Sequence, residues 1–163
     1  MTPKKLLLAF LAAITLPLIN PAVADPITGA TPASSTSSSA KVHRVVFDVS
    51  VNEAESYKTL LRNIANLKKA FGPENVEIEV VAYSKGLDLF LSKDPELVKG
   101  INSLATEGGV ELAACSNTVK ARNVAVSDLP EKAKVIDSGV AELVRRQEEG
   151  WSYIKLASYP AQP

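Results

Sequence analysis

From residue 41 onward, apolar positions fall alternately into short continuous runs and into stripes with helical spacing. Apolar runs predict five strands, at residues 42–51, 76–82, 110–115, 134–136 and 151–156. Helical stripes predict helices over residues 54–71, from Pro95 to the Gly108-Gly109 pair, and from Ser138 to Gly150, with a short helix or turn at 116–122. Strand and helix therefore alternate throughout. This order predicts an α/β fold of three layers, with a mostly parallel five-stranded sheet covered by helices on both faces, as in flavodoxin-like or Rossmann-like folds.

The first 24 residues have the pattern of a secretory signal rather than of a folded element. Lys4 and Lys5 precede an apolar core at residues 6–18, and Ala22-Val23-Ala24 forms a small-residue cleavage site. The core is shorter than the roughly 20 apolar residues of a membrane span. We therefore expect cleavage after Ala24 and a periplasmic or secreted protein, the alternative being an uncleaved anchor.

The remaining chain divides by composition into a tether, one domain and a tail. Residues 25–40 are rich in Ser, Thr, Pro and Ala and predict a disordered tether, because they bury too little apolar surface to offset ordering. Residues 41–157 suffice for a single α/β domain, and 158–163 form the tail. Loss of Lys4 and Lys5 leaves a formal charge of about −2. The chain has no excess of basic residues, so its composition does not indicate a groove that binds nucleic acid.

Cys115 is the only cysteine, so no internal disulfide can form. It lies where the apolar run 110–115 passes into the polar residues 116–118, which predicts the carboxyl edge of a parallel sheet beside a helix N-terminus. Such an end favours a thiolate over a thiol. A free cysteine is also commonly a small buried packing residue. Both interpretations remain open from the residues alone.

Other cysteine chemistries lack their partner residues. A Cys-x5-Arg phosphate cradle would require arginine at position 121, which is Ala121, with Arg122 one place too late. The only histidine, His43, begins the first predicted strand, at the opposite sheet edge from Cys115, so it cannot serve as base or metal ligand there. No glycine-rich phosphate loop follows the first strand at residues 51–54.

Two motifs resemble the DsrE/DsrF-like family: Ala-Cys-Ser-Asn-Thr at residues 114–118 and the tail Ser-Gly-Val-Ala-Glu-Leu-Val-Arg-Arg-Gln-Glu-Glu-Gly-Trp-Ser-Tyr-Ile-Lys at 138–155. The likeness extends over residues 45–155. It implies a small α/β domain, often homo-oligomeric, whose cysteine carries sulfur as a persulfide between proteins; Cys115 matches that position. One departure is the turn at residues 83–86, Tyr-Ser-Lys-Gly, where the family commonly has a His-Gly-Pro-like turn.

For sulfur carriage, Cys115 would be the carrier, Asn117 and Thr118 the hydrogen-bond donors, and Lys85 or Lys120 a nearby positive charge. The alternatives are helix capping for Asn117 and Thr118 and solvated surface charge for the lysines. The first functional hypothesis is thus an exported sulfur-relay protein that works with a donor and an acceptor protein and needs no cofactor or metal. The second is a non-catalytic homo-oligomeric scaffold with Cys115 in its packing.

Three further features have plainer explanations. Tyr57 and Trp151 fall on patterns that predict core or interface positions. The charged run at residues 145–149 predicts a solvated helix end with local pairing, or a contact between subunits.

Overall fold

The computed structural model describes residues 41–158. The strands are β1 (His43–Val49), β2 (Val76–Ala82), β3 (Val110–Cys115), β4 (Lys134–Ile136) and β5 (Ser152–Lys155). The helices are α1 (Ala54–Phe71), α2 (Pro95–Thr106), α3 (Ser116–Ala121) and α4 (Gly139–Glu148), with 3-10 turns η1 (Pro73–Asn75), η2 (Ser84–Leu89) and η3 (Val126–Asp128). The predicted signal peptide and tether, and tail residues 159–163, lie outside the described residues.

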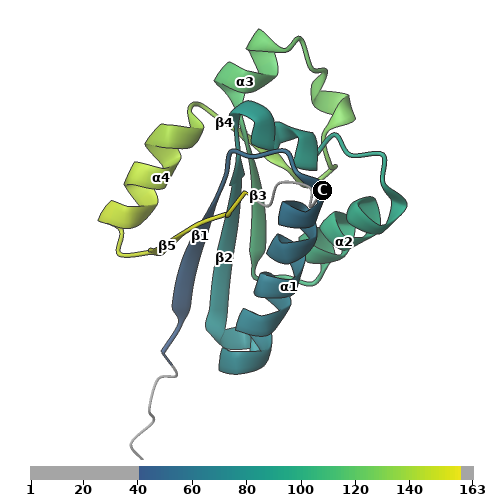
Figure 1. The fold of residues 1–163 in the computed structure, drawn as a ribbon. Helices are drawn as coiled ribbons and strands as arrows, with labels where there is room; N and C mark the ends of the chain where they lie inside the picture. Colours follow the sequence, from purple (N-terminus) through teal and green to yellow (C-terminus); the bar gives the residue numbers. More distant parts are fainter. Residues whose placement is uncertain (1–40, 159–163) are drawn as a thin grey trace, which may run out of the picture. The chain divides into compact units, whose positions relative to one another are not determined.

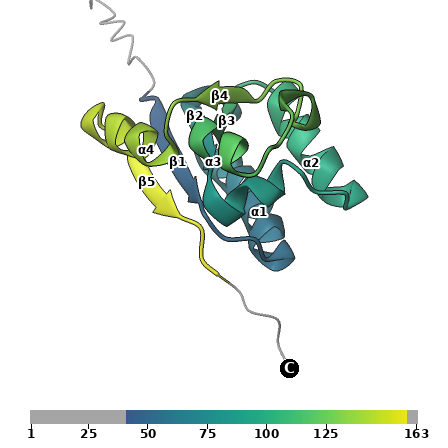
Figure 2. The same ribbon diagram turned by 90° about the horizontal axis from the view of Figure 1, so that it is seen from above.

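The five strands form one sheet in the order β4-β3-β2-β1-β5, and every neighbouring pair is parallel. The predicted α/β fold is confirmed. β1 to β4 are laid down in succession toward one edge, and β5 returns to the far side of β1 (Figures 1 and 2). All carboxyl ends consequently lie at the same edge of the sheet, where ligands of such folds usually bind.

Helices cover both faces of the sheet, but unequally. α1 and α2 lie on one side and α4 on the other (Figure 1). The α1 and α2 side holds the large apolar core, which includes Phe47, Leu60 and Leu112. The α4 side holds a small cluster of Val46, Val81, Ala113 and Leu143. Alternate strand residues point to opposite faces, so the α4 face also receives Asp48, Glu79 and Cys115.

The helices begin and end at capping residues and glycines that can be recognised in the sequence. Asp94 caps α2 by accepting the Glu96 N–H at 2.9 Å, and Ser138 caps α4 by accepting the Ala141 N–H at 3.4 Å. α1 stops at Gly72, whose φ of 88° suits glycine. The connection from β4 to β5 therefore starts α4 at the carboxyl edge, immediately after Ile136 and its short loop.

One face of β2 differs from what its sequence pattern predicts. The alternation of apolar residues with Glu77 and Glu79 over residues 76–80 is typical of a strand with one face partly exposed to solvent. Glu79 is nevertheless only 2% exposed, because α4 covers it and Arg146 of α4 forms an ion pair with it. The expected local pairing is present, with Glu142 and Glu149 also contacting Arg146. The guanidinium lies 4.7 Å from the ring centre of Trp151. The run 145–149 is thus only partly solvated.

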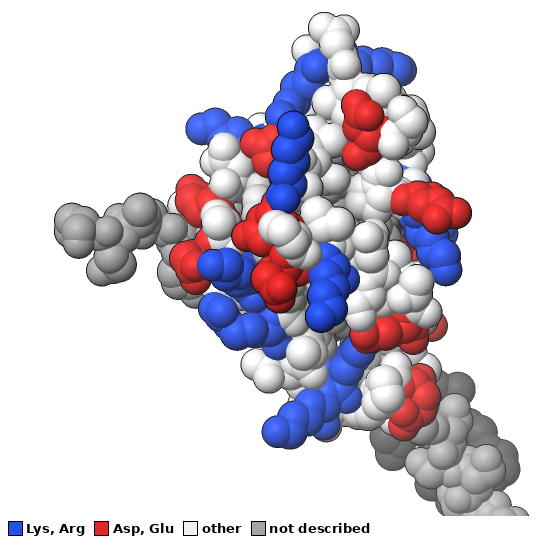
Figure 3. Space-filling model, turned by 90° about the vertical axis from the view of Figure 1, so that its right-hand side faces the viewer, with Lys and Arg blue, Asp and Glu red and all other residues white. Residues whose placement is uncertain are grey.

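Charge on the visible side of the molecule is mixed, with lysines and arginines interspersed among aspartates and glutamates (Figure 3). Within residues 41–158, no helix combines the length and apolar character needed to cross a bilayer. In the same part of the chain, no three His, Cys, Asp or Glu side chains gather as metal ligands.

Candidate functional site

Cys115 ends β3 at the carboxyl edge of the sheet, as predicted. It pairs in register with Ile136 of β4 and is the N-cap residue of α3. Gly139, the first residue of α4, directs its N–H toward the same sulfur. The N-termini of two helices therefore lie near one thiol, and unpaired N–H groups of both helices surround its sulfur.

The thiol is buried, at 5% exposure, yet its surroundings are polar. Burial acts to raise the pKa of Cys115, but the N–H groups of Gly139, Thr118 and Asn117 and the Thr118 hydroxyl act in the opposite direction. Together they outweigh burial, so the pKa lies below its ordinary value. Cys115 makes no well-aligned side-chain cap bond to α3, so the influence of that helix is chiefly that of nearby N–H dipoles. A purely apolar environment would have the reverse effect.

Close packing between Gly139 and Tyr83 places the first amide of α4. A Cβ at position 139 would lie 2.8 Å from the Tyr83 Cβ and 3.0 Å from its Cγ. Only glycine lets the helix start this near to the tyrosine. Burial, followed by the charges of Asp48 and Cys115, raises the pKa of Tyr83 against the effect of a Ser50 hydrogen bond. Tyr83, the residue that departs from the family turn, therefore lies beside the cysteine.

Asp48 is a buried carboxylate, 4% exposed, at the end of β1 on this face. Its Oδ2 accepts a 2.6 Å hydrogen bond from the Tyr153 hydroxyl, while Oδ1 has no partner within hydrogen-bond geometry. The bond to Asp48 raises the pKa of Tyr153 to about 12. Through Tyr83, this carboxylate extends the polar region from Cys115 across the sheet edge.

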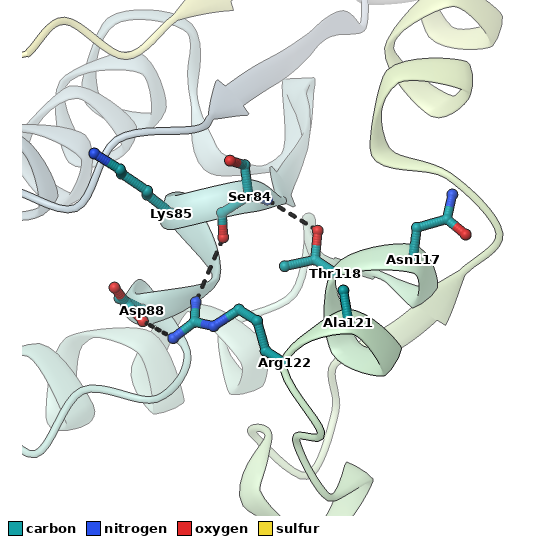
Figure 4. A pocket seen from close by; sticks show the side chains of 7 residues that line it. All are labelled: Ser84, Lys85, Asp88, Asn117, Thr118, Ala121 and Arg122. Atoms are coloured by element: carbon teal, nitrogen blue, oxygen red, sulfur yellow. Dashed lines mark hydrogen bonds and ion pairs between the residues drawn. The ribbon is translucent and has the colours of Figure 1, made fainter.

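The other three predicted site residues line one open pocket of about 470 Å³ beside the cysteine. Lys85 comes from η2, Asn117 and Thr118 from α3, and Cys115 itself does not line the pocket. Figure 4 shows the Thr118 side chain reaching Ser84 of η2. The Lys85 and Asn117 side chains extend away from this contact. Asn117 thus faces Cys115 through its N–H, not its amide side chain.

Arg122, rejected as a phosphate-cradle residue, also lines this pocket. Its guanidinium pairs with Asp88 and donates to the Ser84 carbonyl at 3.4 Å (Figure 4). Lys120 is exposed and lines a different depression, with Val126 and Val135. The arginine therefore joins η2 to α3.

The three residues to which the sequence assigned no role in the site, His43, Tyr57 and Trp151, lie where the sequence predicts them. His43 starts β1, at the opposite edge from Cys115, and stacks on Phe71 with ring centres 3.9 Å apart. Tyr57 is a core residue at 3% exposure. Trp151 packs partly buried against the small cluster under α4.

Sequence reasoning did not find Gly139, Ser84 or Asp48 as neighbours of the site. Gly139 carried one usable signal, because glycine at a helix start without a turn requirement indicates close approach of another group. Asp48 carried a second, as an acid within an apolar strand. Gly139 and Asp48 approach Tyr83, and Ser84 bonds to Thr118, only because of the strand order, which periodicity does not encode.

Comparison with known proteins supports this fold and gives the family. A solved structure described as a protein of unknown function, MTH1491 from Methanobacterium thermoautotrophicum, is 39% identical, with a TM-score of 0.63 over 69% of this chain and 98% of that chain. No curated protein gives a significant match. The DsrE/DsrF-like family profile matches residues 44–156, nearly the whole described domain. The chain therefore belongs to the DsrE/DsrF-like family.

Proposed function

We propose that this protein is a sulfur carrier in which Cys115 alternates between thiolate and persulfide. The observation that carries the proposal is the convergence of N–H groups from α3 and α4 on a buried sulfur, which lowers the pKa of the thiol. Family membership is consistent with such a role. Sulfur carriage asks for one activated thiol and no second cysteine, which suits a chain with only one.

The chemistry balances without an external oxidant. The Cys115 thiolate attacks the terminal sulfur of a donor persulfide, the donor S–S bond breaks, and the donor leaves as a thiolate with the electron pair. In the second half, an acceptor thiolate attacks the terminal sulfur on Cys115, which leaves as thiolate. A low pKa makes Cys115 a good leaving group in that step, and the N–H groups stabilise the anion at both stages.

Lys85, Asn117 and Thr118 are the residues we propose for recognition on the donor and acceptor side. They surround the pocket next to the cysteine, and Lys85 is exposed. A positive charge there suits an incoming anionic persulfide. Replacing Lys85 with Gln is expected to slow transfer from a charged donor while leaving the alkylation of Cys115 by neutral iodoacetamide unchanged.

The alternative function is a homo-oligomeric scaffold in which Cys115 only packs. The 5% exposure of Cys115 favours this alternative, since a carrier must meet its partners. The polar surroundings of the sulfur favour the carrier. The two differ in one measurable property, the reactivity of the thiol.

The deciding experiment incubates the purified protein with a sulfane-sulfur donor and records the intact mass. A carrier gains about 32 Da, the mass of one sulfur, at Cys115 and loses it again to an acceptor thiol. The Cys115→Ser variant, close in size, is the matched control and gains nothing. An unmodified wild-type protein that also resists alkylation would leave the scaffold function in place.

We further propose that the protein is exported and forms homo-oligomers. Export rests on the signal pattern at residues 1–24, and its test is the N-terminal mass after expression in a bacterium, which should begin at Asp25. The oligomeric state is tested by light scattering across a concentration series. A protein that retains residue 1 would refute cleavage, and a monomer at all concentrations would refute assembly.

A further inference from the structure

The 3-10 turn η2 presents two opposite charges on one side, at the pocket of about 470 Å³. A 3-10 helix has three residues per turn, so residues three apart lie one above the other. Gly86 and Leu89 are buried, and a Cβ at Gly86 would lie 1.9 Å from the Val49 carbonyl oxygen, so their side of η2 is pressed against the end of β1. Lys85 and Asp88 are also three apart, and both line the pocket (Figure 4).

Both charges retain capacity for a ligand. The Lys85 ammonium takes part in none of the ion pairs of residues 41–158. Asp88 pairs through Oδ1 with the Arg122 guanidinium, and within the described chain its Oδ2 has no hydrogen-bond partner. Arg122 also donates to the Ser84 carbonyl at 3.4 Å, so it holds the carboxylate against η2. The side chains of Asp88 and Arg122 are each 37% exposed, which leaves them open to a solute in the pocket.

Neighbouring opposite charges select a ligand that carries the same two charges. The rise of one 3-10 turn separates Lys85 from Asp88 by about 6 Å, and the lysine side chain is flexible enough to shorten that gap. A carboxylate and an ammonium group on one ligand carbon can therefore meet both side chains together. A simple anion is attracted by Lys85 but repelled by Asp88, and a simple cation has the reverse difficulty. The pocket volume is within the range of small-molecule sites.

The other wall of the pocket belongs to the helix that follows the cysteine. Asn117 and Thr118 line it, and they come two and three residues after Cys115, within one helical turn of about 5 Å. Cys115 is 5% exposed and does not line the pocket itself. Only a slender group can therefore reach its sulfur from the pocket. An unbranched side chain that ends in two sulfur atoms meets this requirement, whereas the surface of a folded donor protein is too broad.

We propose that the pocket between η2 and α3 binds a free α-amino acid whose side chain carries a persulfide, with Lys85 holding its carboxylate and Asp88 its ammonium group. This inference rests on the proposed sulfur-carrier function for the transfer step. In that step the Cys115 thiolate takes the outer sulfur, the S–S bond breaks, and the amino acid leaves as a thiolate with the electron pair. Recognition of the amino acid can be tested without any transfer.

The test measures the binding of three analogues that hold sulfur as a methyl thioether and so cannot transfer it. S-methyl-L-cysteine carries both charges, methylthiopropanoate only the carboxylate, and methylthioethylamine only the ammonium group. Dissociation constants come from NMR titration of the amide signals of the pocket residues in the purified protein. S-methyl-L-cysteine is expected to bind at least about fivefold more tightly than either analogue, because it gains one further charge contact at an exposed site.

Single substitutions separate the two charges. Lys85→Gln should weaken binding of the amino acid and the propanoate about fivefold without weakening the amine. Asp88→Asn should weaken binding of the amino acid and the amine by a similar factor without weakening the propanoate. Lys69→Gln and Glu74→Gln are the matched controls, because both residues are exposed and lie just before the amino end of β2, at the opposite edge of the sheet. They should change none of the three affinities.

Two results would overturn the proposal. One is equal affinity for the three analogues, and the other is no shift of the pocket signals with S-methyl-L-cysteine. Both are read from the wild type alone, so they hold even where a variant does not fold. The intact mass after incubation with cysteine persulfide keeps the two proposals apart. Selective binding without uptake of sulfur would refute the carrier function and leave the amino-acid site, whereas uptake of sulfur without selective binding would refute the amino-acid site and leave the carrier function.

Discussion

The two ends of α4 stabilise buried polar groups differently, one through a charged side chain and the other through a backbone N–H. Near its carboxyl end, Arg146 neutralises buried Glu79 and contacts Glu142 and Glu149 as well, so charge is met by charge. At its amino end, Gly139 meets Cys115 with a neutral N–H and leaves the sulfur without a paired cation among the ion pairs of residues 41–158. The first arrangement anchors the helix. The second lowers the pKa of the thiol without holding the sulfur in an ion pair.

The largest expected effect breaks the anchored end. Arg146→Ala leaves the Glu79 carboxylate buried without its partner, which should cost about 3–5 kcal/mol of unfolding free energy. Lys58→Ala removes the exposed pair with Glu55 and should cost less than about 1 kcal/mol. Urea denaturation of both variants measures the difference. Equal losses would show that the Glu79 pair is not an anchor.

A smaller effect is expected at the amino end. Gly139→Ala places a methyl group against Tyr83, so the helix start or the ring must move, at a cost of about 1–3 kcal/mol. The first amide of α4 then withdraws from the sulfur, and the pKa of Cys115 should rise. Denaturation and the pH profile of alkylation measure the two effects.

The matched control is Gly100→Ala in α2, where the added methyl would meet only the Leu61 side chain, with the terminal methyl Cδ1 nearest at 2.5 Å. That group can rotate away, and alanine favours the helix, so stability should hold or rise. The thiol should react as in the wild type. If Gly139→Ala behaves like Gly100→Ala, the close approach of α4 to Tyr83 does not control the cysteine.

The smallest expected effect is in the pH dependence of stability. The folded pKa of Cys115 lies below its unfolded value, so the native state loses this proton first as pH rises. The unfolded state then binds more protons, and stability conferred by Cys115 increases from neutral to alkaline pH. Relative to Cys115→Ser, the wild type should therefore gain stability between pH 7 and pH 10. A constant or shrinking difference in urea midpoint would contradict the lowered pKa.

The sequence predicted the fold well because each element is locally encoded. The stripe at 54–71, the cap at Asp94 and the glycine stop after α2 place their elements without reference to the rest of the chain. The position of Cys115 at the carboxyl edge followed from the alternation of strand and helix.

Contacts between elements that are far apart in the chain could not be predicted from the sequence. Glu79 looked solvent-facing because its burial depends on α4, which begins 60 residues later. The Ser84–Thr118 bond joins residues 34 positions apart. Lys85 and Thr118 line one pocket, but only the fold shows that Thr118 accepts the Ser84 N–H whereas the Lys85 side chain extends away.

The most direct test of the central claim, that Cys115 is an activated thiol, is the titration of its ¹³Cβ resonance by NMR. The chain has one cysteine, so labelling with [¹³Cβ]cysteine gives a single signal. The structure predicts a midpoint below that of the same resonance in the urea-unfolded protein. A midpoint at or above that value would contradict the account and leave Cys115 as a packing residue.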